Sequence, residues 1–201
     1  MARATIAARE SFRSNTSVIT TPTGGVVAYG PNLLNAGAMR ARGYNHFAGE
    51  VAGIWGPVTL QGEYHHVNVQ RKPLSPAAAQ RGNVSFHGWH VQAGYILTGE
   101  SRGYDFKTGT IGTIKPTNAC GAWELVARYS SLNLEDKDIN GGTGKNLTLG
   151  ANWYVNNNVR FALNYIRADI NPTGAIAGTL RSPNTPKRKM DFVAARIQVV
   201  F

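Results

Sequence analysis

Apolar and polar positions alternate with a period of two along much of this chain, and residues 192–201 show the alternation most clearly. Val193, Ile197 and Phe201 lie on one side of this segment, whereas Arg196 and Gln198 lie on the other. This period predicts a β-strand with one apolar face and one partly polar face. A final strand that ends on an aromatic residue is typical of bacterial outer-membrane barrels. An edge strand of a soluble sheet would show the same alternation.

Seven more segments share this pattern, so the sequence predicts eight antiparallel strands joined up and down. Gly56-Pro57 predicts a type II′ hairpin turn, because only its first position needs a positive φ, and residues 156–158 predict another tight turn. Long polar connections are expected up to Gly43, over 98–120, around 135–142 and over 171–188. Short turns mostly alternate with long loops, as in an outer-membrane barrel. The predicted strands cover residues 3–9, 44–55, 58–69, 84–97, 122–132, 145–155, 159–168 and 192–201.

The aromatic residues on the apolar faces sort by height along the strands. If Phe201 marks the periplasmic end, one group falls at that rim and a second group falls toward the opposite end. Such belts are typical of transmembrane barrels, where aromatic rings lie at the level of the lipid headgroups. A soluble core gives no reason for this sorting. The first group is Trp55, Tyr95, Trp123, Trp153 and Phe161, and the second is Tyr64, Trp89, Tyr129 and Tyr165.

Composition sets looser limits on the fold and the function. No stretch approaches 18 consecutive apolar residues, which excludes helical membrane spans but not strands of about 9–11 residues. The net charge of +10 indicates an anionic partner, such as nucleic acid, lipopolysaccharide or a small permeating anion. A single Cys120 allows no internal disulfide, and no cysteine or histidine cluster suggests a metal or a cofactor. The first residues contain no signal peptide, so an outer-membrane protein would need an earlier start.

The cations on the polar faces are the candidates for an anion path through the lumen of the barrel. A guanidinium stays charged and is more weakly hydrated than an ammonium, so it can bind an oxyanion and release it. An equally plausible interpretation of any one arginine is that it pairs with a lumenal acid and holds the wall. The candidates are Arg3, Arg9, Arg13, Arg128, Arg160 and Arg196.

The lumenal acids are Glu50, Glu63 and Glu124. The turn at Gly56-Pro57 places Glu50 directly opposite Glu63, an arrangement that is unfavourable unless cations lie between the carboxylates. Two carboxylates could serve a glycosidase, but no nucleophile, base or metal group accompanies them, so we expect no enzyme and no catalytic residue. His65 and His66 point to opposite faces and cannot bind one metal. Glu124 and Arg128 lie roughly 13 Å apart along one strand, too far to pair.

Several ordered motifs resemble the phosphate-selective O/P-type porins, and the resemblance covers essentially the whole chain but only the C-terminal half of a family member. It implies a sixteen-stranded trimeric anion channel with a ladder of lumenal arginines, of which Arg3 and Arg9 resemble two. Residues 1–201 would then be one partial barrel domain in the bacterial outer membrane. It would contact lipid and lipopolysaccharide and pass phosphate, polyphosphate or other small anions. The motifs are residues 55–64, 95–100, 121–130 and 147–156 and the terminal Phe201.

The main alternative is a soluble, basic β-domain that binds nucleic acid or another polyanion. Such a domain should interleave aromatic residues with cations on one face. Here the two kinds of residue mostly occupy opposite faces, so we expect no nucleic-acid partner. We also expect Arg3 and Arg9 to determine anion preference more strongly than the loop cations Arg71, Lys72, Lys187 and Arg188, because a low-dielectric wall focuses the field of a lumenal charge.

Overall fold

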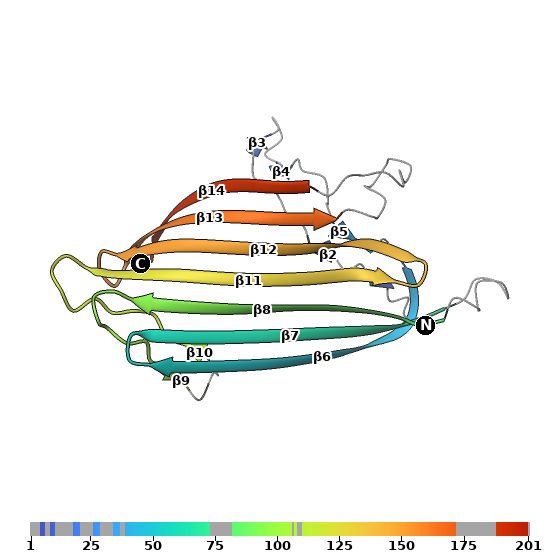
Figure 1. Cartoon of the computed structure of the whole chain (residues 1–201), viewed down its shortest axis with the longest axis horizontal. Coiled ribbons are helices and arrows are strands. Elements are labelled where there is room, and N and C mark those ends of the chain that lie inside the picture. The colour runs from blue at the N-terminus through green and yellow to red at the C-terminus, as the bar shows by residue number, and fades with distance from the viewer. Residues whose placement is uncertain are drawn as a thin grey trace.

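The computed structural model describes residues 5–6, 9–10, 18–20, 26–28, 34–36, 39–72, 82–105, 107, 110–171 and 188–200. In these ranges eight strands form one antiparallel sheet in the order β1-β6-β7-β8-β11-β12-β13-β14, with β1 and β14 at its edges. Figure 1 shows the long strands from β6 to β14 side by side. Consecutive long strands therefore pair up and down, as predicted. The strands are β1 (Thr5–Ile6), β6 (Met39–Trp55), β7 (Val58–Arg71), β8 (Val84–Ile96), β11 (Ala122–Asp136), β12 (Ile139–Tyr154), β13 (Val159–Asn171) and β14 (Arg188–Val199).

The shorter strands form three separate pairs within the described residues. β2 (Arg9–Glu10) pairs with β5 (Leu34–Asn35), β3 (Val18–Thr20) with β4 (Val26–Ala28), and β9 (Tyr104–Asp105) with β10 (Thr110–Ile111). None of the described residues lies in a helix that is long and apolar enough to cross a membrane.

The tight turns follow from local chemistry. Gly56 has a φ of 54°, the positive value predicted for the first position of its turn. The side-chain oxygen of Asn156 accepts hydrogen bonds from the backbone N–H groups of Asn158 and Val159, both at 2.9 Å. The turn after β6, the connection after β8 and the turn after β12 lie at one end of the sheet, which we call the short-turn end; the C-terminus lies there too (Figure 1).

The loop predicted around residues 135–142 is wrong. β11 and β12 continue to Asp136 and Ile139, which are direct partners, and only Lys137 and Asp138 form the turn. Lys137 takes the positive φ of 52° that this turn requires. The acids of the supposed loop are held by the neighbouring hairpin, because Asp138 pairs with Arg71 at 2.7 Å and Asp136 accepts the backbone N–H of Ser85 at 2.7 Å.

Of the strand predicted over residues 3–9, Thr5–Ile6 is confirmed as a strand of the large sheet, and residues 3–4 and 7–8 lie outside the described residues. Thr5–Ile6 pairs with β6 in the large sheet, whereas Arg9–Glu10 pairs with β5 in a separate sheet. The polar loop predicted up to Gly43 contains three short strands and the start of β6. Leu34, Ala36 and Met39, which interrupt its polar sequence, are all buried. These three side chains pack into an apolar cluster, although the sequence around them shows no alternation.

The two faces of the sheet differ as the alternation predicts. One face, which we call the outer face, carries nearly all of the large apolar side chains that are exposed. Trp123 stacks on Trp153 and Trp153 on Phe161, each with ring centroids 5.5 Å apart, so these members of the predicted belt are neighbours. The exposed set on this face includes Phe47, Val51, Trp55, Leu60, Tyr64, Trp89, Val91, Tyr95, Trp123, Leu125, Tyr129, Leu147, Leu149, Phe161, Leu163, Tyr165, Val193 and Ile197.

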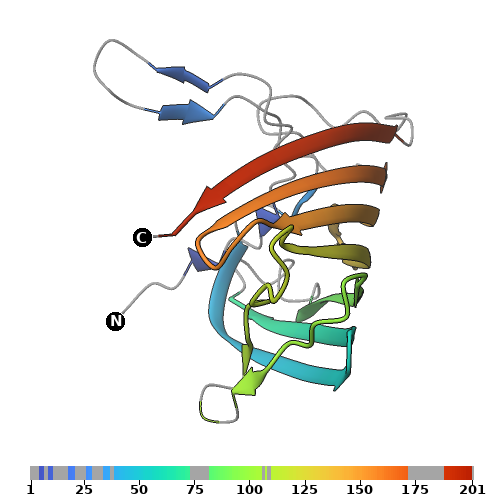
Figure 2. The ribbon, with the colours of Figure 1, turned by 90° about the vertical axis from the view of Figure 1, so that its left-hand side faces the viewer.

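The opposite, inner face is lined by chain segments that pack on it. Figure 2 shows the strands nearly end-on and the curvature of the sheet. At the end away from the short turns, inner-face side chains of β7, β8, β11 and β13 form an apolar cluster with Leu34, Ala36 and Met39. Toward the short-turn end the inner face carries polar side chains, beside a second, smaller apolar cluster of Ile96, Ile114, Ala122 and Tyr154. The inner-face members of the first cluster are Val69, Val84, Phe86, Leu134, Ala168 and Ile170.

Candidate functional site

The polar part of the inner face is the candidate site, and strand register arranges its side chains in rows across the sheet. Glu50 lies opposite Glu63, as predicted, and Glu63 lies opposite His90. In the next row, Gln61 lies opposite Gln92, which in turn lies opposite Arg128. Side chains from strands far apart in sequence therefore meet at one height.

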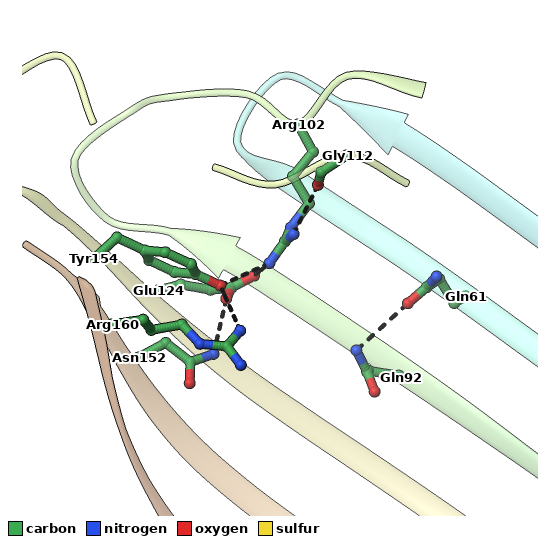
Figure 3. Close-up of polar contacts among 8 residues, drawn as sticks. All are labelled: Gln61, Gln92, Arg102, Gly112, Glu124, Asn152, Tyr154 and Arg160. Atoms are coloured by element: carbon green, nitrogen blue, oxygen red, sulfur yellow. Dashed lines mark hydrogen bonds and ion pairs between the residues drawn. The ribbon is translucent and has the colours of Figure 1, made fainter. Parts of the chain in front are cut away.

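Glu124 occupies the centre of a polar network near the short-turn end (Figure 3). Its side chain is only 3% exposed, and the Arg102 guanidinium pairs with it at 2.7 Å. The Asn152 amide and the Tyr154 hydroxyl each donate to its other oxygen at 2.9 Å. A buried carboxylate needs such partners, because an unpaired charge in a low-dielectric environment is strongly destabilising. Arg102 also donates to the carbonyl of Gly112 at 3.0 Å, which ties the connection between β8 and β11 to the inner face.

The close approach of this ion pair to the sheet depends on Gly94 of β8. A Cβ atom at Gly94 would lie 2.9 Å from an oxygen of Glu124. Any side chain there would displace the carboxylate. The presence of glycine at position 94 is therefore explained by packing and not by its backbone conformation.

The same connection holds a second buried acid, Glu100. Thr98 donates to one oxygen of its carboxylate, and the backbone N–H and the hydroxyl of Thr117 reach the other at 3.2 and 3.1 Å. Burial raises the pKa of Glu100, but these hydrogen bonds outweigh it and hold the pKa below the ordinary value. For Arg102, burial lowers the pKa, and the bond and charge of Glu124 outweigh it and raise the pKa. Both groups therefore stay charged.

Arg160, a predicted anion-path residue, is held by neutral groups. Its guanidinium lies 5.6 Å from the centre of the Tyr154 ring, and it donates to Gln198 at 2.8 Å and to the Tyr154 hydroxyl at 3.4 Å. Such contacts orient a guanidinium without neutralising it. The expectation that an arginine pairs with a lumenal acid therefore does not describe Arg160.

Arg128 and Arg196 lie on the inner face by register, opposite Gln92 and Ala162, and both are exposed. Neither makes a hydrogen bond or an ion pair with any residue that the structure describes. Glu124 pairs with Arg102 and not with Arg128, as their predicted separation requires. Both guanidinium groups are therefore open to solvent and lack a partner among the described residues.

Glu63 is bound by histidines, where cations had been expected between it and Glu50. His65 donates to one carboxylate oxygen, and Nδ1 of His90 lies 3.5 Å from the other. The His46 ring stacks on His65, with 3.0 Å between Nε2 and Nδ1. His66, opposite His87, lies on the outer face, so the two consecutive histidines do diverge. Within the described ranges no group of three or more histidine, cysteine or acidic side chains could hold a metal ion.

The remaining candidates are less well defined. Arg3 and Arg13 lie outside the described residues, and Arg9 is placed only by the backbone of β2. Sequence reasoning missed Arg102, because it lies in a connection without alternation. Glu124 could have indicated such a residue, because an acid between apolar neighbours on an inner face requires a nearby cation.

Comparison with known proteins agrees with this arrangement. The model of the family "Phosphate-selective porin O and P" matches residues 15–201. Porin O of Pseudomonas aeruginosa is 34% identical over 128 residues, which are 58% of this chain and 28% of that protein. An uncharacterised protein of Caulobacter vibrioides is 33% identical over 86 residues, which are 40% of this chain and 17% of that protein.

The matched stretches thus span less than a third of either relative. Porins of this family are channels of the Gram-negative outer membrane and not enzymes, in agreement with the predicted location and with the expectation of no enzyme. The family model covers nearly the whole chain and agrees with the resemblance of its motifs. This chain belongs to the phosphate-selective porin O and P family.

Proposed function

We propose that the full-length protein is a passive outer-membrane channel for anions, with phosphate or polyphosphate as the favoured class. Residues 1–201 would form one partial domain, half of the wall of a sixteen-stranded barrel. The observation that carries this proposal is the outer face, where large apolar side chains are exposed across seven consecutive strands. Soluble monomers rarely expose an apolar surface of this extent. In a membrane the same surface contacts lipid.

The edges of the sheet support the larger barrel. β1 and β14 end the sheet on either side, and unpaired strand edges in lipid cost several kcal/mol per group. A barrel of eight strands alone would have an interior only wide enough for side chains. We propose that further strands of the full-length protein pair with both edges and leave a water-filled lumen.

The inner face supplies the chemistry for anions. Arg128 and Arg196 present guanidinium groups that pair with none of the described residues, and Arg160 is oriented by an aromatic ring without loss of charge. Spaced cations in a narrow pore bind an anion strongly enough to admit it and weakly enough to release it. Arg3, Arg9 and Arg13 remain candidates for the same path. Contacts with lipopolysaccharide and assembly of a trimer belong to this proposal as well.

The alternative of a soluble domain that binds nucleic acid is less consistent with the two faces. Such a domain would need aromatic rings beside cations on one surface. The exposed tryptophans lie on the outer face and the unpaired arginines on the inner face. Recovery of the natural protein in the soluble fraction without detergent would favour this alternative.

The channel proposal is tested by reversal potentials of the full-length protein in planar bilayers under a salt gradient. Anion preference is expected, and neutralising Arg128 and Arg196 together should reduce the anion-to-cation permeability ratio severalfold. Neutralising the surface cations Lys72 and Lys137 is the matched control, because salt screens exposed charges within about 8 Å. Cation preference of the unaltered protein would contradict the proposal.

A further inference from the structure

The middle of the inner face contains a hollow of about 380 Å³, lined on one side by Glu63, His90, Arg128 and Ser130 and on the other by Phe86 and Leu132. Gly88 also lines the hollow between His90 and Phe86 on β8, and it lets the side chain of Leu132 pack close to β8, since a Cβ there would lie only 3.0 Å from Cδ1 of Leu132. The hollow therefore combines a guanidinium, a hydroxyl and a carboxylate within one small volume.

The carboxylate is unexpected on the path of an anion, because it repels every anion equally by charge. Its orientation is fixed, however. A carboxylate only accepts hydrogen bonds, so Nε2 of His65 must donate to Glu63. In a neutral His65 ring, Nδ1 then accepts from Nε2 of His46 at 3.0 Å. This chain of two histidines holds Glu63 with acceptor positions still free, because a carboxylate offers about four of them.

The donors of the hollow lie across from this acceptor. Arg128 and Ser130 make no hydrogen bond with any described residue. Glu63 and Ser130 are separated by two strand spacings, roughly 10 Å, through His90. That distance prevents a direct contact, and the side chain of His90, with Nδ1 3.5 Å from Glu63, stands between them in this row, so a small ion that meets both must lie over His90 within the hollow.

We propose that this hollow is a binding site for an oxyanion that still carries a hydroxyl group, such as monovalent phosphate, and that Glu63 selects it. Arg128 and Ser130 donate to the ionised oxygens of the ligand, and Glu63 accepts the hydrogen bond from its O–H. An anion of equal charge without an O–H, such as nitrate, meets the same donors but is only repelled by Glu63. The inference rests on the proposed channel function and names how its substrate class is recognised.

Glu50 provides a matched control for the charge of Glu63. The two carboxylates lie directly opposite each other on neighbouring strands, so they contribute the same charge at the same height. Glu50 does not line the hollow. Replacing either one by glutamine removes one negative charge from the same row, but only Glu63→Gln replaces a charged acceptor of the hollow by a weaker, neutral amide oxygen.

The experiment measures the permeability of the full-length porin to phosphate and to nitrate in planar bilayers, at a pH where phosphate is monovalent. The phosphate-to-nitrate ratio should fall about tenfold in Glu63→Gln, the loss expected for one hydrogen bond to a charged group. It should stay within about twofold of the unaltered value in Glu50→Gln. Arg128→Gln should lower the permeability to both anions. Glu63→Asp, which keeps a carboxylate, should retain a higher ratio than Glu63→Gln.

The outcomes separate this inference from the proposed function. If the unaltered channel prefers anions and both glutamine variants change the ratio equally, Glu63 acts only through its charge and the inference is wrong. A ratio unchanged in Glu63→Gln has the same consequence. If the unaltered channel shows no anion preference, the proposed function fails, and the inference fails with it.

Discussion

The two ends of the inner face hold chain segments in different ways. At the short-turn end, the connection between β8 and β11 is held by the buried pair of Arg102 and Glu124 and by a small apolar cluster around Ile114. At the other end, Leu34, Ala36 and Met39 are fixed by an apolar cluster around Phe86 and Ile170. Both segments would otherwise be loops, and both become part of the inner wall.

Because the two ends are held by different interactions, they should respond to different changes. Apolar burial is non-directional and grows with area, so the cluster tolerates small shifts as long as it stays filled. An ion pair in a buried site depends on geometry and on the charge of each partner. The apolar end should therefore respond to lost volume, whereas the polar end should respond to lost charge, displaced atoms and pH.

The largest effect is expected from Phe86→Ala at the apolar end. Phe86 is 4% exposed within the cluster, and emptying such a site costs about 3–5 kcal/mol. Urea unfolding of the refolded full-length porin, followed by tryptophan fluorescence, measures this loss. The matched control is Phe192→Ala, since Phe192 also lies on the inner face but is 37% exposed. Equal losses in both variants would contradict the role given to the cluster.

The next largest effect is expected from Arg102→Met at the polar end. The variant leaves Glu124 buried without its cation, a change that costs about 3 kcal/mol or more. Amide hydrogen exchange over residues 98–121 should show the loss as faster local opening. Adding Glu124→Gln to the same variant should restore much of the protection, because the unpaired charge is then removed. A double variant as unprotected as the single one would show that the pair is not what holds the connection.

Sequence alone revealed the alternating strands and the two faces, because period two is a local signal that each strand repeats. It correctly placed Glu50 opposite Glu63, since a two-residue turn fixes the register of its hairpin. It failed for Leu34, Ala36 and Met39, which pack on distant strands from a segment without alternation, and for Arg102, which pairs with an acid of β11. The sequence also predicted a loop over Asp136 and Asp138, because this segment is polar. In the structure the strands continue there, and the two acids contact Ser85 and Arg71, which the sequence pattern does not reveal.

A smaller effect at the polar end is expected from Gly94→Ala. The added Cβ would lie 2.9 Å from an oxygen of Glu124 and would shift the carboxylate away from Arg102. Overpacking of this kind costs about 1–3 kcal/mol. The control is Gly49→Ala, where the nearest atom would lie 3.9 Å from the added Cβ. Faster exchange over residues 98–121 in Gly94→Ala alone is the expected result, and equal exchange in both variants would contradict it.

The smallest effect is the response of the polar end to acid through Glu100. Because the pKa of Glu100 is held below its ordinary value of 4.5, the released connection binds more protons than the docked one. The stabilisation is therefore complete above pH 4.5 and is lost as the pH falls through the lowered pKa.

Protection factors over residues 98–121, which correct for the intrinsic pH dependence of exchange, should decline in this range. Glu100→Gln should begin with lower protection and lose this part of the decline. The apolar cluster contains no titratable group, so protection of β13 at Ala168 and Ile170, which belong to this cluster, should change less over the same range. Parallel declines in the unaltered protein and in Glu100→Gln would show that another group senses the acid.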